Sequence, residues 1–228
     1  MLGSIGQSKN QKKLKMANNT VDKYTSLKSL LKENKEGVDF EVEVENRISP
    51  VSVIAFHGGQ IEEGTTEIAR EIARLGQYKY YSFIGKKQNK NLELHITSTK
   101  FDHKPCMEMV VNSVATIAVH GADEPEDLIY VGGKNFVHAH FIKYELRLDG
   151  FKVVDEIRPG LEGYSPLNLC NRNMRNAGVQ LELSEGLRAR LFGVPDWKKR
   201  DKRSTPTNDF KLFNEAIFRA TQHYLNIP

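Results

Sequence analysis

Two segments of the chain share one pattern, a short apolar run that ends in His-Gly. The first is Val53-Ile-Ala-Phe-His57-Gly-Gly, and the second is Thr116-Ile-Ala-Val-His120-Gly-Ala. An apolar run rich in β-branched and aromatic residues and bounded by glycine is typical of a strand buried on both faces. Such strands occur in α/β sheets covered by helices, and these sheets bind ligands at the carboxyl ends of their strands. The repeat therefore predicts an α/β fold with both histidines at a ligand-binding edge.

The rest of the chain alternates strand-like and helix-like segments. Strands are expected at residues 39–45, 52–56, 78–84, 92–96, 110–119, 128–131, 151–154 and 178–183. Helices are expected at residues 24–35, 65–75, 136–148, 184–191 and 210–224, with Asn135 and Ser184 as N-caps. Residues 158–176 are rich in Pro, Gly and Asn, and we expect a long loop of the functional or disordered kind. The alternation predicts an α/β fold with a mixed, largely parallel central sheet flanked by helices.

Length and composition are those of an ordinary globular protein. The chain has 228 residues, of which 39% are hydrophobic and 27% charged, so we expect one α/β domain over residues 16–228. No apolar stretch reaches the roughly 18 residues of a membrane span, and no apolar segment follows the N-terminal lysines. We therefore expect no membrane partner and cytoplasmic residence. Cys106 and Cys170 are expected to be reduced thiols.

The net charge of +4 raises the alternative of a phage accessory protein that binds nucleic acid. The excess comes from four lysines within residues 1–15, which we interpret as a solvated tail or as an extension upstream of a second start at Met16. Basic residues also cluster at 198–203, but Trp197 is the only aromatic residue nearby. A single-strand platform needs several interleaved aromatic rings, so nucleic acid is the less favoured partner.

The strand-end histidines are joined by a nearby carboxylate. Glu62 follows the Gly58-Gly59 turn, which can fold the chain back so that Glu62 meets His57, and His120 joins them if its strand is adjacent. Two imidazoles and one carboxylate are a common ligand set of catalytic zinc, with a fourth position open for water. The alternative is that each histidine simply ends a strand and is satisfied by hydrogen bonds.

A second carboxylate interrupts an apolar strand. In Val179-Gln-Leu-Glu182-Leu, alternation places Gln180 and Glu182 on the face opposite the apolar residues. At a sheet edge Glu182 would be solvated, whereas in a central strand it would need a partner. A carboxylate beside a metal-activated water is suited to general-base catalysis. Outside these strands, the loop 98–102 between His95 and His103 is a further candidate for the wall of the site.

These motifs occur in an order that resembles a known family. The segments concerned are His57-Gly-Gly-Gln-Ile-Glu62-Glu-Gly-Thr65, Leu94-His-Ile-Thr-Ser98 with Phe101-Asp102, Val119-His120-Gly, Asn171-Arg172 and Gly178-Val-Gln-Leu-Glu182-Leu. In this order they resemble the phage-type poly-γ-glutamate hydrolases over most of the chain. The resemblance implies a fold like that of the zinc carboxypeptidases, in which His57, Glu62 and His120 bind Zn²⁺ and Glu182 is the general base. It also implies hydrolysis of γ-glutamyl amide bonds.

The implied substrate carries a free α-carboxylate on every residue, so the groove is expected to present cations. Arginine can grip a carboxylate through two hydrogen bonds. The candidates are Arg172, Arg175 and Arg188, with Asn171 beside them, although loop arginines are also often merely solvated. An amidohydrolase or peptidase of the same fold, acting on another acylated amino acid or on a peptide, remains open. The oligomeric state is left open as well.

Overall fold

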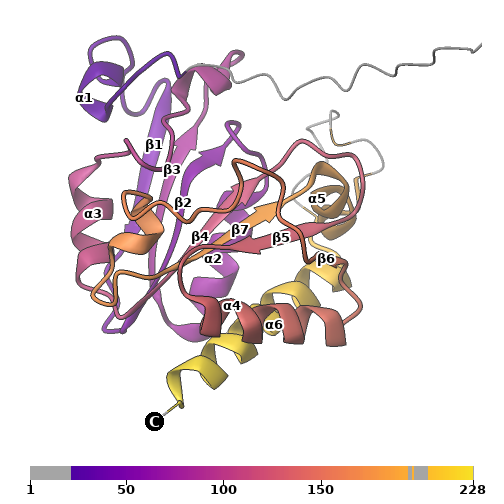
Figure 1. Cartoon of the computed structure of the whole chain (residues 1–228). Helices are drawn as coiled ribbons and strands as arrows, with labels where there is room; N and C mark the ends of the chain where they lie inside the picture. The colour runs from indigo at the N-terminus through magenta and orange to yellow at the C-terminus, as the bar shows by residue number, and fades with distance from the viewer. Residues whose placement is uncertain (1–21, 195–196, 198–204, 228) are drawn as a thin grey trace, which may run out of the picture.

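A computed structural model describes residues 22–194, 197 and 205–227, and its centre is a seven-stranded sheet (Figure 1). The strand order is β1-β3-β2-β4-β7-β5-β6. The strands are β1 Phe40–Glu45, β2 Val51–Gly59, β3 Lys79–Gly85, β4 Ala115–Gly121, β5 Ile129–Gly132, β6 Val153–Val154 and β7 Val179–Leu183. Strands β3, β2, β4 and β7 run parallel, while β1 pairs antiparallel with β3 and β5 antiparallel with β7. The predicted mixed, largely parallel sheet is confirmed.

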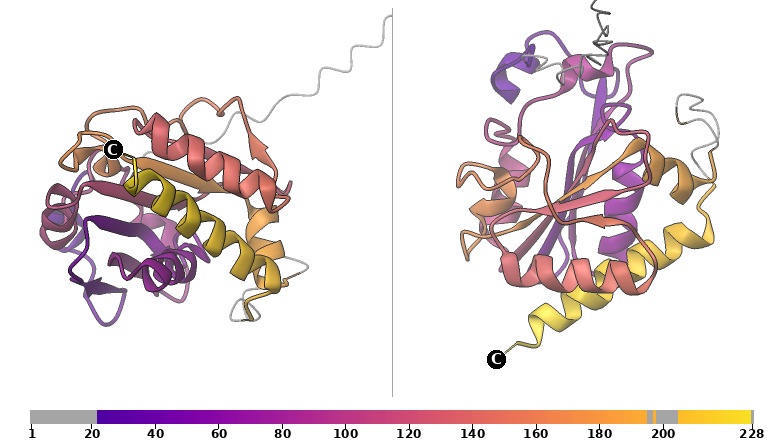
Figure 2. Two further views of the ribbon diagram at one scale, coloured as in Figure 1. Left: turned by 90° about the horizontal axis from the view of Figure 1, so that it is seen from below. Right: turned by 45° about the vertical axis from the view of Figure 1, so that its right-hand side comes forward.

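Helices cover both faces of the sheet. The α-helices are α1 Leu27–Leu30, α2 Thr65–Gly76, α3 Lys104–Val111, α4 Phe136–Leu148, α5 Glu185–Phe192 and α6 Asn208–Leu225, and the 3-10 helices are η1 Asn91–Leu94 and η2 Leu169–Arg172. One core joins α2, α4, α5 and α6 to the sheet, and α4 and α6 lie side by side (Figure 2). A second core, on the other face, is formed with α1, α3, η1 and η2.

The central strands are apolar without interruption because they contact both cores. Val53 and Ala55 of β2 pack in the first core, whereas Ile54 and Phe56 pack in the second. Alternate side chains of a strand point to opposite faces, so a strand between two helical layers has no solvated face. This explains the apolar run before His57 and places the histidine at the end of a buried strand.

The predicted strand at 92–96 is wrong, and two other predicted elements are shorter than expected. Residues 91–94 form the 3-10 helix η1, in which Leu92 is 69% exposed rather than buried in a sheet. The predicted helix at 24–35 is reduced to α1, and the predicted strand at 110–119 divides into the end of α3 and the strand β4. Pro105 in the first turn favours α3, because proline at this position sacrifices no helical hydrogen bond.

The predicted helix caps are present. The side chains of Asn135 and Ser184 accept hydrogen bonds from the backbone N–H groups of His138 and Leu187. Both cysteines are buried and free, as expected. Across the part of the chain that the structure describes, no helix has the length and apolarity needed to cross a bilayer.

Candidate metal centre and active site

The two strand-end histidines lie side by side at one edge of the sheet. Strands β2 and β4 are parallel neighbours, so both carboxyl ends reach the same edge. The rings of His57 and His120 are 5.0 Å apart between centroids, and both residues are buried, at 2% and 3% exposure. The β2–β3 register shifts between Ala55 and Gly58, across His57 itself. Such an irregularity re-aims a side chain next to a site.

Glu62 bridges the two imidazoles. Its Oε1 lies 2.9 Å from His57 Nδ1, and its Oε2 lies 3.4 Å from His120 Nδ1. The backbone N–H of Gly121 also donates to Oε2, at 3.0 Å. The turn folds back as expected, because the N–H of Glu62 donates to the His57 carbonyl at 2.9 Å. Burial opposes ionisation of Glu62, but the two histidines outweigh it and hold the pKa of this carboxyl well below its usual range.

The donor set at this point has the chemistry of a cation site. His57 Nε2 lies 2.8 Å from the carbonyl oxygen of Ile96, which can only accept, so Nε2 carries the proton. In the neutral ring Nδ1 then presents a lone pair toward the carboxylate of Glu62, which is also an acceptor. Two acceptors at 2.9 Å need a proton or a metal ion between them. A backbone carbonyl that orients a metal-binding histidine in this way is common in metal sites.

A third histidine, His95, completes the cluster. One potential ligand atom from each of His57, Glu62 and His95 lies within 4.8 Å of the others. The ring of His95 packs on that of His57 at 3.9 Å between centroids, and its Nε2 is 3.9 Å from Glu62 Oε1. The nearby His57, followed by burial, lowers the pKa of His95 to about 4. His120 Nε2 is buried without a hydrogen-bond partner among the described residues.

Glu182 lies in a central strand and not at an edge. Strand β7 runs between β4 and β5, and Glu182 is in register with His120 on one side and with Tyr130 on the other. The carboxyl group is buried and accepts a 2.8 Å hydrogen bond from Gln180 Nε2. Burial, followed by the charge of Glu62, raises the pKa of Glu182 well above its usual value. A buried carboxyl group with a raised pKa, next to a candidate metal site, is suited to proton transfer.

Arg188 is a buried structural side chain. It is only 4% exposed, and it donates hydrogen bonds to the carbonyls of Glu63, Ala122 and Leu183. The first two acceptors directly follow Glu62 and Gly121, so Arg188 ties together the two turns that carry the site. Its guanidinium also lies over the ring of Trp197.

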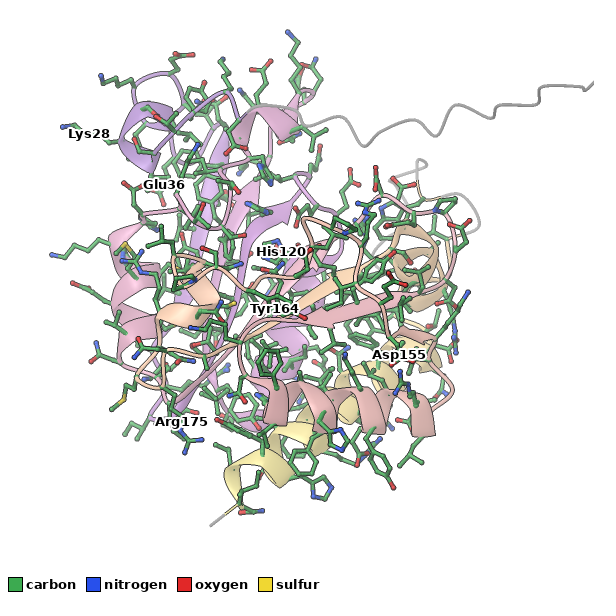
Figure 3. All side chains as sticks on the ribbon, viewed as in Figure 1. Lys28, Glu36, His120, Asp155, Tyr164 and Arg175 are labelled. Carbon is green, nitrogen blue, oxygen red and sulfur yellow. The ribbon has the colours of Figure 1, made fainter. Side chains whose placement is uncertain are left out.

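The part of the loop that carries Asn171 and Arg175 lies toward the amino end of β7, whereas Glu182 lies toward its carboxyl end. The side chain of Asn171 accepts from the N–H of Gly178, four residues before Glu182 on an extended chain, which is about 13 Å away. Its amide donates to the carbonyls of Gly163 and Ser165, so all of its bonding is internal. Arg175 donates to the hydroxyl of Tyr224 in α6 and lies away from His120 in Figure 3. Arg172 is partly buried at the end of η2.

The structure adds a cation that the sequence analysis did not single out. Arg158 forms ion pairs with Asp123 and Glu124 at 3.1 and 2.7 Å, and its charge offsets a small part of the rise in the pKa of Glu182. In the sequence, the one feature that could have indicated Arg158 is its position at the start of the long loop 158–176. The basic residues that suggested nucleic-acid binding, within 1–15 and 198–203, lie outside the described residues. Trp197 is buried at 5% exposure and offers no stacking surface.

The buried histidines His57 and His120 meet the carboxylate of Glu62 at the carboxyl edge of this sheet, and the buried Glu182 lies beside them. This arrangement defines a candidate α/β metallohydrolase. The comparisons with known proteins give the family. A model of the family described as poly-gamma-glutamate hydrolase matches residues 24–216, and the chain belongs to this family. The family that the sequence motifs resemble, and the hydrolase class that this resemblance implies, are both confirmed.

Individual relatives and solved structures are similar to this chain over most of its length. YndL of Bacillus subtilis (strain 168) is 38% identical over 190 residues, which are 83% of this chain and 74% of YndL. A bacteriophage poly-gamma-glutamate hydrolase structure is similar over 91% of this chain and 100% of that chain, with 29% identity and a TM-score of 0.86. A zinc-free apo structure of YndL is similar over 89% and 98%, with 35% identity and a TM-score of 0.81. N-formylglutamate amidohydrolase from Ralstonia eutropha, 10% identical with a TM-score of 0.50, shares the fold alone.

Proposed function

We propose that this protein is a zinc-dependent hydrolase that cleaves the γ-glutamyl amide bonds of poly-γ-glutamate. The observation that carries the proposal is the carboxylate of Glu62, 14% exposed in its side chain, which lies between two buried strand-end histidines in a member of this family. The relative whose structure is described as zinc-free supports zinc as the metal. The arrangement of His57, Glu62 and His120 supports the ligand set expected from the resemblance.

The ligand atoms follow from the hydrogen bonds. His57 would bind through Nδ1, because its Nε2–H is used by the Ile96 carbonyl, and His120 would bind through the Nδ1 that faces Glu62 Oε2. Zinc held in this way supplies a Lewis acid that polarises a carbonyl group and lowers the pKa of a bound water to about 7. The buried surroundings strengthen such electrostatic effects, because water does not screen them.

Glu182 is proposed as the group that moves the proton. In register with His120, it stands beside the ligand cluster, on the strand next to β4. The carboxylate takes a proton from the attacking water and delivers it to the nitrogen of the departing amine. Gln180 donates to Oε1 and so holds the carboxyl group in place for both transfers. Burial raises the pKa of Glu182, and a raised pKa makes its carboxylate a stronger base.

Substrate carboxylates need cations near this site. Among the arginines expected from the sequence, Arg188 is used internally and Arg175 binds Tyr224, while Arg172, next to Asn171 at the end of η2, stays a prediction from the sequence. Arg158, which is 35% exposed in its side chain and lies near Glu182, is a second candidate. A substrate carboxylate would compete with Glu124 for this guanidinium.

Replacement of Glu182 by glutamine tests the proposal. The Glu182→Gln variant should bind zinc as the wild type does and lose hydrolysis of γ-linked polyglutamate by at least about 100-fold, the size typical of a lost general base. Glu185→Gln, three residues further along in the first turn of α5, is the matched control and should keep its activity. An α-linked polyglutamate peptide should be cleaved poorly by the wild type. Full activity of Glu182→Gln, or a preference of the wild type for the α-linked peptide, would contradict the proposal.

A further inference from the structure

We infer that Asp22 is a positioning residue for the metal site and acts through residues 95–97. The inference rests on the proposed zinc function and concerns how the ligands are held. Asp22 precedes α1 and lies just outside the region that the family model matches, 24–216. Its partners are more than seventy residues away in the sequence.

Both oxygens of the Asp22 carboxylate are used. Oδ1 lies 2.7 Å from His95 Nδ1, and Oδ2 accepts a 2.8 Å hydrogen bond from the backbone N–H of Thr97. The Asp22 side chain is 9% exposed, so these bonds are largely shielded from water. Asp22 therefore binds both ends of the segment 95–97.

The segment 95–97 makes two contacts with His57. The carbonyl of Ile96, between the two anchored residues, lies 2.8 Å from His57 Nε2, and the ring of His95 packs on the ring of His57. The Ile96 carbonyl decides which nitrogen of His57 is left for a metal ion. A displaced segment would release the His57 ring to rotate, so Asp22 holds a ligand that it does not touch.

The same carboxylate orients His95. A neutral His95 that donates Nδ1–H to Asp22 presents the lone pair of Nε2 to the cluster, 3.9 Å from Glu62 Oε1. A carboxylate behind a histidine at a metal site fixes both the ring and its tautomer, and loss of such a partner costs about 10- to 100-fold in metal affinity. We expect Asp22 to have this effect on zinc.

The N-terminal segment has other anchors that would remain without Asp22. Lys23 forms ion pairs with Glu33 and Glu93, and the backbone N–H of Leu27 donates to Asp102 at 2.7 Å. Tyr24 and Leu27 are also buried in the second core. Loss of the Asp22 carboxylate should therefore leave the segment folded and change the geometry of the site.

The experiment measures zinc affinity in competition with a chromophoric chelator, for the full chain without substrate. Asp22→Asn should bind zinc about 10- to 100-fold more weakly than the wild type. Lys23→Gln is the matched control, because it removes neighbouring surface ion pairs and should leave the affinity unchanged. The visible spectrum of the Co²⁺-substituted protein should change in Asp22→Asn and not in Lys23→Gln. The metal-free forms of all three proteins should be folded and should each unfold in one cooperative transition.

The outcomes separate this inference from the proposed function. A wild type that binds no zinc contradicts the proposed function. A wild type that binds zinc, together with an Asp22→Asn variant of equal affinity and equal cobalt spectrum, overturns only the role of Asp22. An equal loss in Lys23→Gln, or a metal-free Asp22→Asn that is not folded, also overturns it, because the residue would then act on the fold of the segment.

Discussion

Replacement of Arg188 by methionine distinguishes a structural role from the substrate-binding role expected from the sequence. Methionine retains much of the length and apolar volume of the side chain and removes the guanidinium. Two carbonyl oxygens, those of Glu63 and Ala122, then lose the donor that lies 2.8 Å from each of them, whereas the Leu183 carbonyl keeps the backbone N–H of Ala122 at 2.8 Å. Arg188 is 4% exposed, so water has little access to replace it.

The expected loss of stability follows from these bonds. An unsatisfied buried polar group costs about 1–3 kcal/mol. Removal of the buried charge recovers part of its desolvation cost, which places the net loss for the two acceptors near the low end, about 2 kcal/mol. The free energy of unfolding of a domain is about 5–15 kcal/mol, so this loss is large but leaves a folded protein.

Urea unfolding of the metal-free protein measures this loss, and Arg190→Met is the matched control on the same helix. Arg190 pairs with Asp127 and Asp209 and is 32% exposed in its side chain, so its removal should cost about 1 kcal/mol or less. We expect Arg188→Met to unfold at a clearly lower urea concentration than Arg190→Met. The reasoning is refuted if Arg188→Met is as stable as the wild type, and a rise in KM alone would support the substrate-binding role instead.

Two further predictions concern stability. Burial lowers the pKa of His138 to about 3. As the pH falls below about 6.5, this histidine is therefore protonated in the unfolded chain and stays neutral in the folded protein. The free energy of unfolding should decrease by about 1.4 kcal/mol per pH unit between pH 6.5 and 3. His138→Phe should reduce the pH slope of the unfolding free energy between pH 6.5 and 5, and an unchanged slope would contradict this account. A Cβ on Gly178 would lie 2.0 Å from the carbonyl oxygen of Cys170, so Gly178→Ala should cost about 1–3 kcal/mol or more in urea unfolding. Gly150→Ala, whose Cβ meets nothing within 4 Å, should cost about 1 kcal/mol from its φ of +79° alone, and a reversed order would refute the steric argument.

Local sequence patterns predicted the parts of this fold that depend on neighbouring residues. The apolar runs before His57 and His120 predicted buried strands, and alternation in β7 predicted the face on which Glu182 lies. The pairing of β2 with β4 then brings the two histidines together. The resemblance to a family selected the same residues, so the centre of the site was accessible from the sequence.

Contacts between distant segments were not accessible in this way. Leu92, Leu94 and Ile96 alternate as in a strand, yet residues 91–94 form the 3-10 helix η1, and Asp22, more than seventy residues earlier in the chain, binds residues 95 and 97. Arg188 and Arg175 are both arginines near suggestive motifs, but only the tertiary structure shows what each guanidinium contacts. His95 belongs to the cluster through the same long-range bonds, and its spacing from Glu62 carries no signal.

The pairing of β7 with β4 and β5 fixes the relative positions of three side chains at the candidate site through the backbone. Tyr130, Glu182 and His120 form one row across three hydrogen-bonded strands, so their spacing is set by main-chain geometry and does not depend on flexible connections. A slip of a single residue would turn the glutamate to the far side of the sheet. A change in the loops around this row would alter what can be bound and leave the distance between the proposed base and the proposed ligand constant.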